Sequence, residues 1–129
     1  MKKQKKLKPL IQNAYVNKSS VHGWGGFAKM TIEKDGMIEE CPYVESTAAK
    51  KHPKDILRYL FTGQKKNTTM LILGYGAVYN HAKRNNAKYF FDDEKDAIVF
   101  IAKKKIKKGE EIFVNYGNEY WASRKKKPK

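Results

Sequence analysis

The stretch Gly109-Glu110-Glu111-Ile112-Phe113-Val114-Asn115-Tyr116-Gly117 carries more information about the fold than any other part of the chain. It follows a lysine-rich turn, and its apolar residues predict a short final strand over residues 112–116, ended by Gly117. A tyrosine at the end of a buried strand lies where the sheet opens, so its phenol can face a ligand. The same pattern also fits a core tyrosine with a satisfied hydroxyl, which is common at such positions.

Two earlier segments interrupt apolar runs in a similar way. Gly23-Trp24-Gly25-Gly26 breaks the chain and would let the backbone approach a ligand closely, because glycine has no Cβ. A tight hairpin bend explains the same residues without a ligand. Tyr79-Asn80-His81 is the second segment, in which Asn80 offers both a donor and an acceptor. The alternative is a loop whose polar side chains cap backbone groups, so neither segment defines a site alone.

The remaining pattern predicts a mainly β fold. Short strands are expected at residues 14–17, 27–32, 37–44, 70–73, 88–91 and 97–102, the last two forming a hairpin joined by the acidic loop 92–96. Residues 80–86 are polar and basic, as in a loop. One helix is expected after Pro53 and before Gly63, from the helical spacing of Ile56, Leu57, Tyr59, Leu60 and Phe61. The order of elements does not fit a parallel βαβ fold.

Length and charge suggest one domain with basic ends. The chain has 129 residues and a formal net charge of +15. Residues 1–8 hold five lysines, and residues 124–129 hold Arg124 and four lysines. We expect a basic tail over residues 1–12, a folded domain over 13–123 and a second basic tail over 124–129. The tails predict attraction to nucleic acid or another polyanion, although solvated tails or a nuclear address explain them equally well.

Several classes of protein are disfavoured by composition. Cys41 is the only cysteine, which excludes an internal disulfide and a cluster of thiolate zinc ligands. The three histidines are widely separated, so no metal site is expected. The longest apolar-leaning stretch, residues 68–81, is too short and too interrupted to cross a bilayer. No secretory leader is visible, and we expect an intracellular protein without membrane partners.

The order and spacing of the three segments together resemble the SET domain. The resemblance rests on Gly23-x-Gly25-x-Phe27-Ala28, on Asn80-His81, and on Gly109-Glu110-Glu111 followed by Tyr116-Gly117, and it covers roughly residues 19–121. SET proteins are protein-lysine methyltransferases that use S-adenosylmethionine. The compact SET proteins of large viruses look closest, because they share the small size and phrases such as Leu73-Gly74-Tyr75-Gly76-Ala77.

The resemblance implies a fold and a set of cofactor-binding residues. The fold is a group of short curved sheets with a C-terminal pseudoknot, which brings Asn80-His81 beside Tyr116. The backbone around Gly23, Trp24 and Gly25 would hold the methionine end of the cofactor, and Asn80 with the His81 backbone would hold adenine. The implied cofactor-binding residues are Gly23, Trp24, Gly25, Asn80, His81, Tyr116 and Trp121.

The resemblance also implies a catalytic residue and a substrate channel. Tyr116 is the catalytic tyrosine of the family, and Tyr59 and Tyr75 would form walls of the lysine channel. Val114 occupies a position that helps to set how many methyl groups are added, where many relatives carry Phe or Tyr. Ala82 replaces the serine that usually follows Asn-His, which removes a hydrogen bond worth about 1 kcal/mol.

The implied partner is a protein with an exposed lysine, such as a histone tail. Acidic residues, among them Glu39, Glu40, Glu45 and those of residues 92–96, are candidates to line a groove for a basic segment. The basic tails suggest contact with DNA, the location would be nuclear, and a homodimer is left open. The alternative function is a catalytically weak SET-like module that binds chromatin or nucleic acid.

Overall fold

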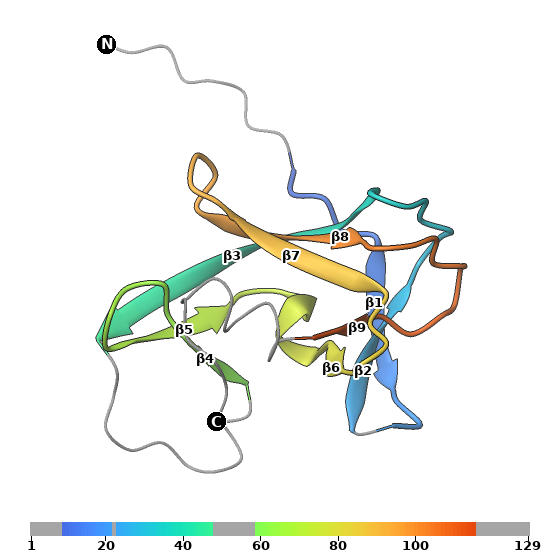
Figure 1. Ribbon diagram of the computed structural model, residues 1–129, viewed down its shortest axis with the longest axis horizontal. Helices are drawn as coiled ribbons and strands as arrows, with labels where there is room; N and C mark the ends of the chain where they lie inside the picture. The colour runs from blue at the N-terminus through green and yellow to red at the C-terminus, as the bar shows by residue number, and fades with distance from the viewer. Residues whose placement is uncertain (1–8, 22, 48–58, 116–129) are drawn as a thin grey trace.

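The computed structural model describes residues 9–21, 23–47 and 59–115 (Figure 1). These residues form nine strands and one short 3-10 helix. The strands are β1 (Ala14–Lys18), β2 (Trp24–Ala28), β3 (Met37–Thr47), β4 (Leu60–Thr62), β5 (Thr68–Ile72), β6 (Asn80–His81), β7 (Ala87–Asp92), β8 (Ala97–Ala102) and β9 (Phe113–Val114), and the helix is η1 (Tyr75–Val78). The mainly β expectation is therefore confirmed.

The largest sheet is antiparallel with strand order β4-β5-β3-β8-β7. The long strand β3 pairs with β8 through its first half and with β5 through its second half. Pro42 lies where the partner changes, opposite Ala97 at the start of β8, and its carbonyl accepts a hydrogen bond of 2.8 Å from the Leu73 amide. The strand continues through this proline because the ladder changes partner there.

Two small sheets complete the structure. Strands β1 and β2 form an antiparallel hairpin, and β6 pairs with β9 in parallel. Helix η1 contacts β1, β2, β3 and β5, so it lies where the hairpin meets the large sheet. The core is centred on Phe100, which is fully buried and packs edge-to-face on Tyr79 with ring centroids 5.1 Å apart. Aromatic pairs of this geometry stabilise a core beyond the area they bury.

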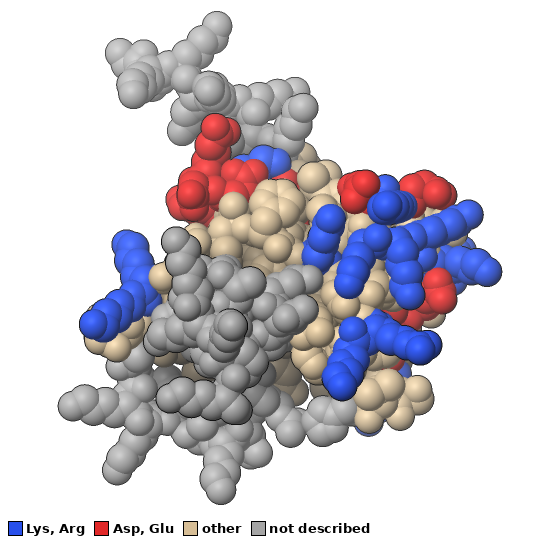
Figure 2. All heavy atoms as spheres, in the orientation of Figure 1, with Lys and Arg blue, Asp and Glu red and all other residues tan. Residues whose placement is uncertain are grey.

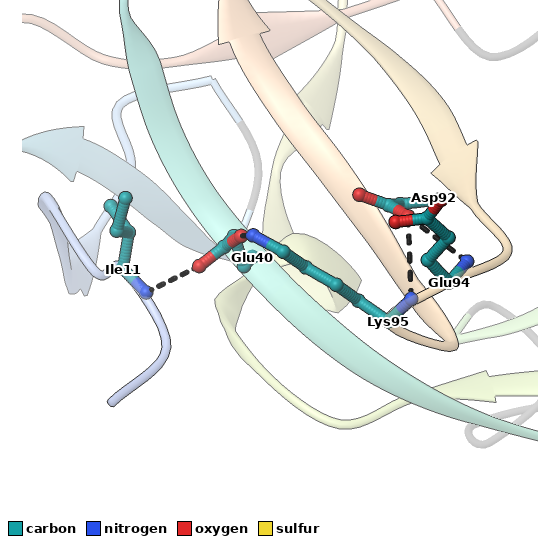
Figure 3. A network of polar contacts seen from close by, with 5 residues as sticks. All are labelled: Ile11, Glu40, Asp92, Glu94 and Lys95. Atoms are coloured by element: carbon teal, nitrogen blue, oxygen red, sulfur yellow. Dashed lines mark hydrogen bonds and ion pairs between the residues drawn. The ribbon is translucent and has the colours of Figure 1, made fainter. Parts of the chain in front are cut away.

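The segment before β1 is attached to β3. The Ile11 amide donates a 2.9 Å hydrogen bond to Glu40, and Gln12 bridges to Glu39. Figure 3 shows Glu40 between Ile11 and Lys95, whose ammonium group also contacts the carboxylate. Glu39 and Glu40 are 1% and 5% exposed, so they hold the fold together and do not line a groove for substrate.

Most of the predicted strands are confirmed, including the β7–β8 hairpin. The predicted helix is wrong in the part that lies within the described residues. Leu60–Thr62 is strand β4, with Leu60 opposite Leu71, and residues 48–58 lie outside the described part. Apolar residues at 60 and 61 fit a helix face or a paired strand, and pairing with β5 decides between them.

Two predicted breaks also belong to strands. Gly25 and Gly26 are buried within β2, and the expected loop over residues 80–86 begins with strand β6. A Cβ on Gly26 would lie 2.2 Å from Cε1 of Tyr79. Glycine therefore permits close packing of β2 on a buried ring, and it does not bend the chain at this point.

Candidate active site

The three segments singled out in the sequence converge around residues 110–114. On one side, Ala28 donates to the carbonyl of Glu110 at 2.9 Å and Ile112 donates to the carbonyl of Gly26 at 2.8 Å. On the other side, Ala82 donates to the carbonyl of Val114 at 3.0 Å, next to the parallel β6–β9 pair. The final strand segment thus lies between β2 and β6, close to the centre of Figure 1.

Glu111 is the side chain that ties these segments together. Its carboxylate accepts hydrogen bonds from Ser19 Oγ at 2.9 Å and from Asn80 Nδ2 at 2.8 Å. A Cβ on Gly25 would lie 2.5 Å from Glu111 Oε2, so the absence of a side chain at residue 25 makes room for the carboxylate. The sequence interpretation missed both Ser19 and Glu111 as functional candidates. An acidic residue beside a strand otherwise made of apolar residues was the available signal.

The side chain of Asn80 is held by β2 and by Glu111 at once. Besides Glu111, its Nδ2 atom donates to the backbone carbonyl of Trp24 at 3.4 Å. The side-chain nitrogen is engaged by protein oxygens, which fixes the orientation of the amide. Three of the predicted cofactor-binding residues, Trp24, Gly25 and Asn80, are therefore neighbours in space.

Of the other predicted cofactor-binding residues, some lie in the described part of the chain and some lie outside it. Gly23 precedes β2 with a φ of +52°, a left-handed conformation that favours glycine. Trp24 is 50% exposed, with the ammonium of Lys18 5.3 Å from its ring centre. His81 pairs with Val114 and is exposed. Tyr116 and Trp121 lie outside the described residues.

The buried carboxylate of Glu39 supports the region around Asn80 from the core side. Glu39 accepts hydrogen bonds from Gln12 Nε2, from the Tyr79 hydroxyl and, at 2.9 Å, from the Tyr75 amide. These donors come from the N-terminal segment, from the residue before β6 and from the start of η1. Three donors compensate the carboxylate for its loss of solvent. The position of the Asn80 backbone is thus set from inside the core as well as by β9.

The predicted channel residues lie at one end of the β4–β5 pair or in the core. Tyr59 directly precedes β4, and Tyr75 follows β5 by three residues, so the antiparallel pair brings both backbones to the same end. Tyr75 is 41% exposed, whereas Val114 is fully buried opposite His81. These positions leave the channel assignment as a prediction.

A separate hollow of about 580 Å³ lies at the far end of β3. It is lined by Tyr43, Glu45, Ser46, Thr47, Gln64, Lys65, Thr68, Asp93 and Asp96. Burial, helped by the negative charges of Asp96 and Glu45, raises the pKa of Tyr43. Among the described residues, none of the predicted cofactor or channel residues lines this hollow.

Comparison with known protein families shows to which family the chain belongs. The family model of the SET domain matches residues 23–117, so the chain belongs to the SET-domain family. A solved structure of a candidate histone methyltransferase from Plasmodium falciparum is similar, with a TM-score of 0.67 and 32% identity, over 86% of this chain and 98% of that one. The predicted SET fold is confirmed, and a lysine methyltransferase is supported in general.

Two structures of Polycomb Repressive Complex 2 are also similar. The apo complex with two substitutions in Ezh2 has a TM-score of 0.64 and 27% identity over 83% of this chain. A humanized mutant of the Chaetomium thermophilum complex, bound to an inhibitor, has a TM-score of 0.61 and 28% identity over 83% of this chain. The chain spans only 15% of each of those chains.

Other comparisons add limits. Comparison with curated protein sequences gave no match. The similar structures include proteins from Plasmodium falciparum and Chaetomium thermophilum, and they do not support the predicted closeness to viral SET proteins. Among the described residues, no helix is long and apolar enough to cross a membrane, and no group of three metal-ligating side chains occurs.

Proposed function

We propose that this protein is an S-adenosylmethionine-dependent protein-lysine N-methyltransferase. The observation that carries the proposal is the convergence of Gly25, Asn80 and Glu111 beside the parallel β6–β9 pair, in a chain of the SET family. The resemblance implies that the cofactor binds beside these residues, and their polar groups support the proposal.

The residues present fit a cationic cofactor. Glu111 contributes a negative charge, and its hydrogen bonds fix the Asn80 amide for contact with a polar ligand. Gly23, Trp24, Gly25 and the His81 backbone would complete the cradle. When bound, S-adenosylmethionine supplies a methyl group activated by a sulfonium. The carboxylate favours positive charge nearby, and the indole of Trp24 offers an exposed face.

The target lysine must be neutral before it can react. A free lysine has a pKa of about 10.4, so about one in 10³ is neutral at pH 7, a cost of about 4–5 kcal/mol. A narrow channel walled by Tyr59 and Tyr75 would disfavour the ammonium by excluding water. No dedicated base is then required.

Tyr116 is proposed as the catalytic residue. Its hydroxyl would orient the amine and interact with the polarised methyl group, which favours a linear approach. Val114, two residues earlier, has less volume than Phe or Tyr and would leave room for a methylated amine or a water molecule. Ala82 in place of serine is expected to cost stability more than activity.

A histone is the proposed substrate class, since the Plasmodium falciparum relative is described as a candidate histone methyltransferase. An extended lysine-containing segment would add to a strand edge through backbone hydrogen bonds. A nuclear location, DNA contact through the basic tails and a homodimeric assembly are further parts of this proposal.

The decisive experiment measures methyl transfer from labelled S-adenosylmethionine to core histones and nucleosomes, with Tyr116→Phe as control. Incorporation that disappears in the variant, while calorimetry still detects cofactor binding, supports the proposal. Incorporation by Tyr116→Phe at the normal rate contradicts the assignment of Tyr116. Absence of both incorporation and cofactor binding would favour the catalytically weak chromatin-binding module.

A further inference from the structure

One face of the folded domain is strongly basic. It is made by three connections: residues 29–36 between β2 and β3, residues 82–86 between β6 and β7, and residues 103–112 between β8 and β9. We call it the basic face, and its exposed basic side chains are Lys29, Lys34, Lys83, Arg84, Lys103, Lys104, Lys105, Lys107 and Lys108. Figure 2 shows Lys and Arg atoms gathered on the right-hand side of the molecule, over these connections.

The lysines of the basic face stand on a fixed backbone. Ile106 is fully buried within the run Lys103-Lys104-Lys105-Ile106-Lys107-Lys108. It exchanges two backbone hydrogen bonds with Ile32, of 2.7 and 2.8 Å. Lys103 is tied to the 82–86 connection through its amide, which donates to Asn86 at 2.8 Å, and its ammonium, which donates to Asn85 at 3.1 Å. The charges therefore have a defined arrangement, unlike charges on a solvated tail.

Few acidic groups compensate this charge. The exposed acidic residues on the same connections are Glu33, Asp35 and Glu110. The only ion pairs recorded among the described residues there join Lys105 to Glu33 at 4.0 Å and Lys88 to Asp35 at 3.8 Å. Both pairs are long and solvent-exposed, so they neutralise little of the field. Most of the lysine charge of the basic face is available to a polyanion.

The chemistry of the basic face favours phosphates over a protein partner. Protein interfaces depend on buried aromatic and apolar anchors, and Met30 is the only large apolar residue exposed on these described connections. Single-stranded nucleic acid is bound by stacking on aromatic side chains, and the described connections expose none. Lysines on a stiff surface with no stacking platform match the outer phosphates of a duplex.

We propose that the basic face binds the phosphate backbone of double-stranded DNA. This function is additional to methyl transfer, and it does not require the basic tails. Besides any contact made by the tails, the folded domain would contact DNA through the β2–β3, β6–β7 and β8–β9 connections. Contacts of this kind position a protein without reading base sequence, so binding is expected to be strong at low salt and independent of sequence.

The test compares two matched pairs of lysines in the full chain. Lys107 and Lys108 lie in a turn of the basic face, and Lys65 and Lys66 lie in the β4–β5 turn, so each double substitution to Gln removes two exposed charges from a turn. Binding to a fluorescent 30-base-pair duplex is followed by anisotropy between 50 and 200 mM salt. We expect the 107/108 variant to bind several-fold more weakly and to reduce the salt slope by about 2, because each phosphate contact contributes about 0.9.

Three results would overturn the proposal. Equal losses in the 65/66 and 107/108 variants would mean that net charge alone matters, which overturns the proposal. A substitution of Lys2, Lys3, Lys5 and Lys6 by Gln that abolishes binding, while the 107/108 variant binds normally, would also overturn it in favour of the tail. Displacement of the duplex by polyglutamate as effectively as by unlabelled DNA would assign the face to an acidic protein. Melting temperatures equal to wild type confirm that each variant is folded.

Discussion

The side chain of Asn80 donates a hydrogen bond of 2.8 Å to the carboxylate of Glu111, across 31 residues of sequence. Asn80 belongs to β6 and Glu111 pairs with β2 through Phe27. One contact therefore links two segments that the resemblance connects with the cofactor. Glu111 is expected to position Asn80 and to attract a cation, and these two effects can be separated by substitution.

Glu111→Ala is expected to weaken binding of S-adenosylmethionine by roughly 10–100-fold, because it removes the negative charge and the hydrogen bond that orients Asn80, and a hydrogen bond to a charged group is worth about 1.5–3 kcal/mol. Glu111→Gln keeps an acceptor for Asn80 and removes the charge, so it should lose less affinity for S-adenosylmethionine than Glu111→Ala. The affinity lost by Glu111→Gln should be larger for S-adenosylmethionine than for S-adenosylhomocysteine, since only S-adenosylmethionine carries a sulfonium. Calorimetry with both ligands measures the difference.

Ser19→Ala is the matched control for Glu111. It removes a donor to the carboxylate and leaves the contact between Asn80 and Glu111 in place, so a small change in affinity is expected. Cofactor binding by Glu111→Ala at wild-type affinity would show that the carboxylate has only a structural role or none.

Gly26→Ala should destabilise the fold by about 1–3 kcal/mol through overpacking. Its new methyl would lie 2.2 Å from the Tyr79 ring, which is 3% exposed and cannot move into solvent. Gly109→Ala provides the comparison, because a Cβ there meets nothing within 4 Å and only the positive φ of 87° opposes it. Thermal unfolding should rank the Gly26 variant below the Gly109 variant, and the opposite order would refute the packing argument.

The stability of the protein is expected to fall with acidification through Glu40. Hydrogen bonds from Lys95 first and from the Ile11 amide second hold the pKa of Glu40 below its usual value (Figure 3). A depressed pKa in the folded state stabilises the protein above the unfolded pKa of about 4.3, and this contribution is lost as the pH falls through the lower folded value.

Glu40→Gln should therefore be less stable than wild type at pH 7, and the difference should be smaller at pH 3, as measured by urea unfolding at both values. The exposed neighbour of Lys95, Glu94, supplies the control Glu94→Gln, for which little change is expected at either pH. A constant difference between Glu40→Gln and wild type across the two pH values would argue against the linkage.

Cys41 should be inert to thiol reagents in the folded protein. It is fully buried, and burial, with the nearby charge of Glu39 as a second cause, raises its pKa. The thiolate is the reactive form, so reaction should require unfolding. Because the chain has a single cysteine, titration with a chromogenic disulfide should give no colour under native conditions and one equivalent in denaturant. Rapid native labelling would contradict this burial.

Local patterns predicted the parts of the fold that depend on local contacts. The β7–β8 hairpin was predicted from two strand-like segments that flank the acidic loop 92–96, and β8 occupies the residues expected for it. The prediction of a helix around residues 56–61 is wrong at Leu60 and Phe61. These residues pair with β5, a long-range contact that apolar spacing cannot reveal.

The candidate site was predictable only through resemblance. Nothing local joins Asn80 to Glu111, and the parallel pairing that brings them together links segments far apart in the chain. Gly25 and Gly26 were predicted to let a ligand approach the backbone, and in the structure the groups next to them are Glu111 and Tyr79 of this chain. Burial of Glu39 and Glu40 could not be foreseen, because acidic residues are usually exposed.

The parallel pairing of β6 with β9 also has a consequence for biosynthesis. Residues 110–114 insert between β2 and β6, so these two segments cannot be joined until residue 114 has left the ribosome. Pairings between distant segments close long loops and form slowly. A nascent or C-terminally truncated chain could therefore build the β7–β8 hairpin while having no competence to bind ligand, and acquisition of activity should trail the appearance of β structure during refolding.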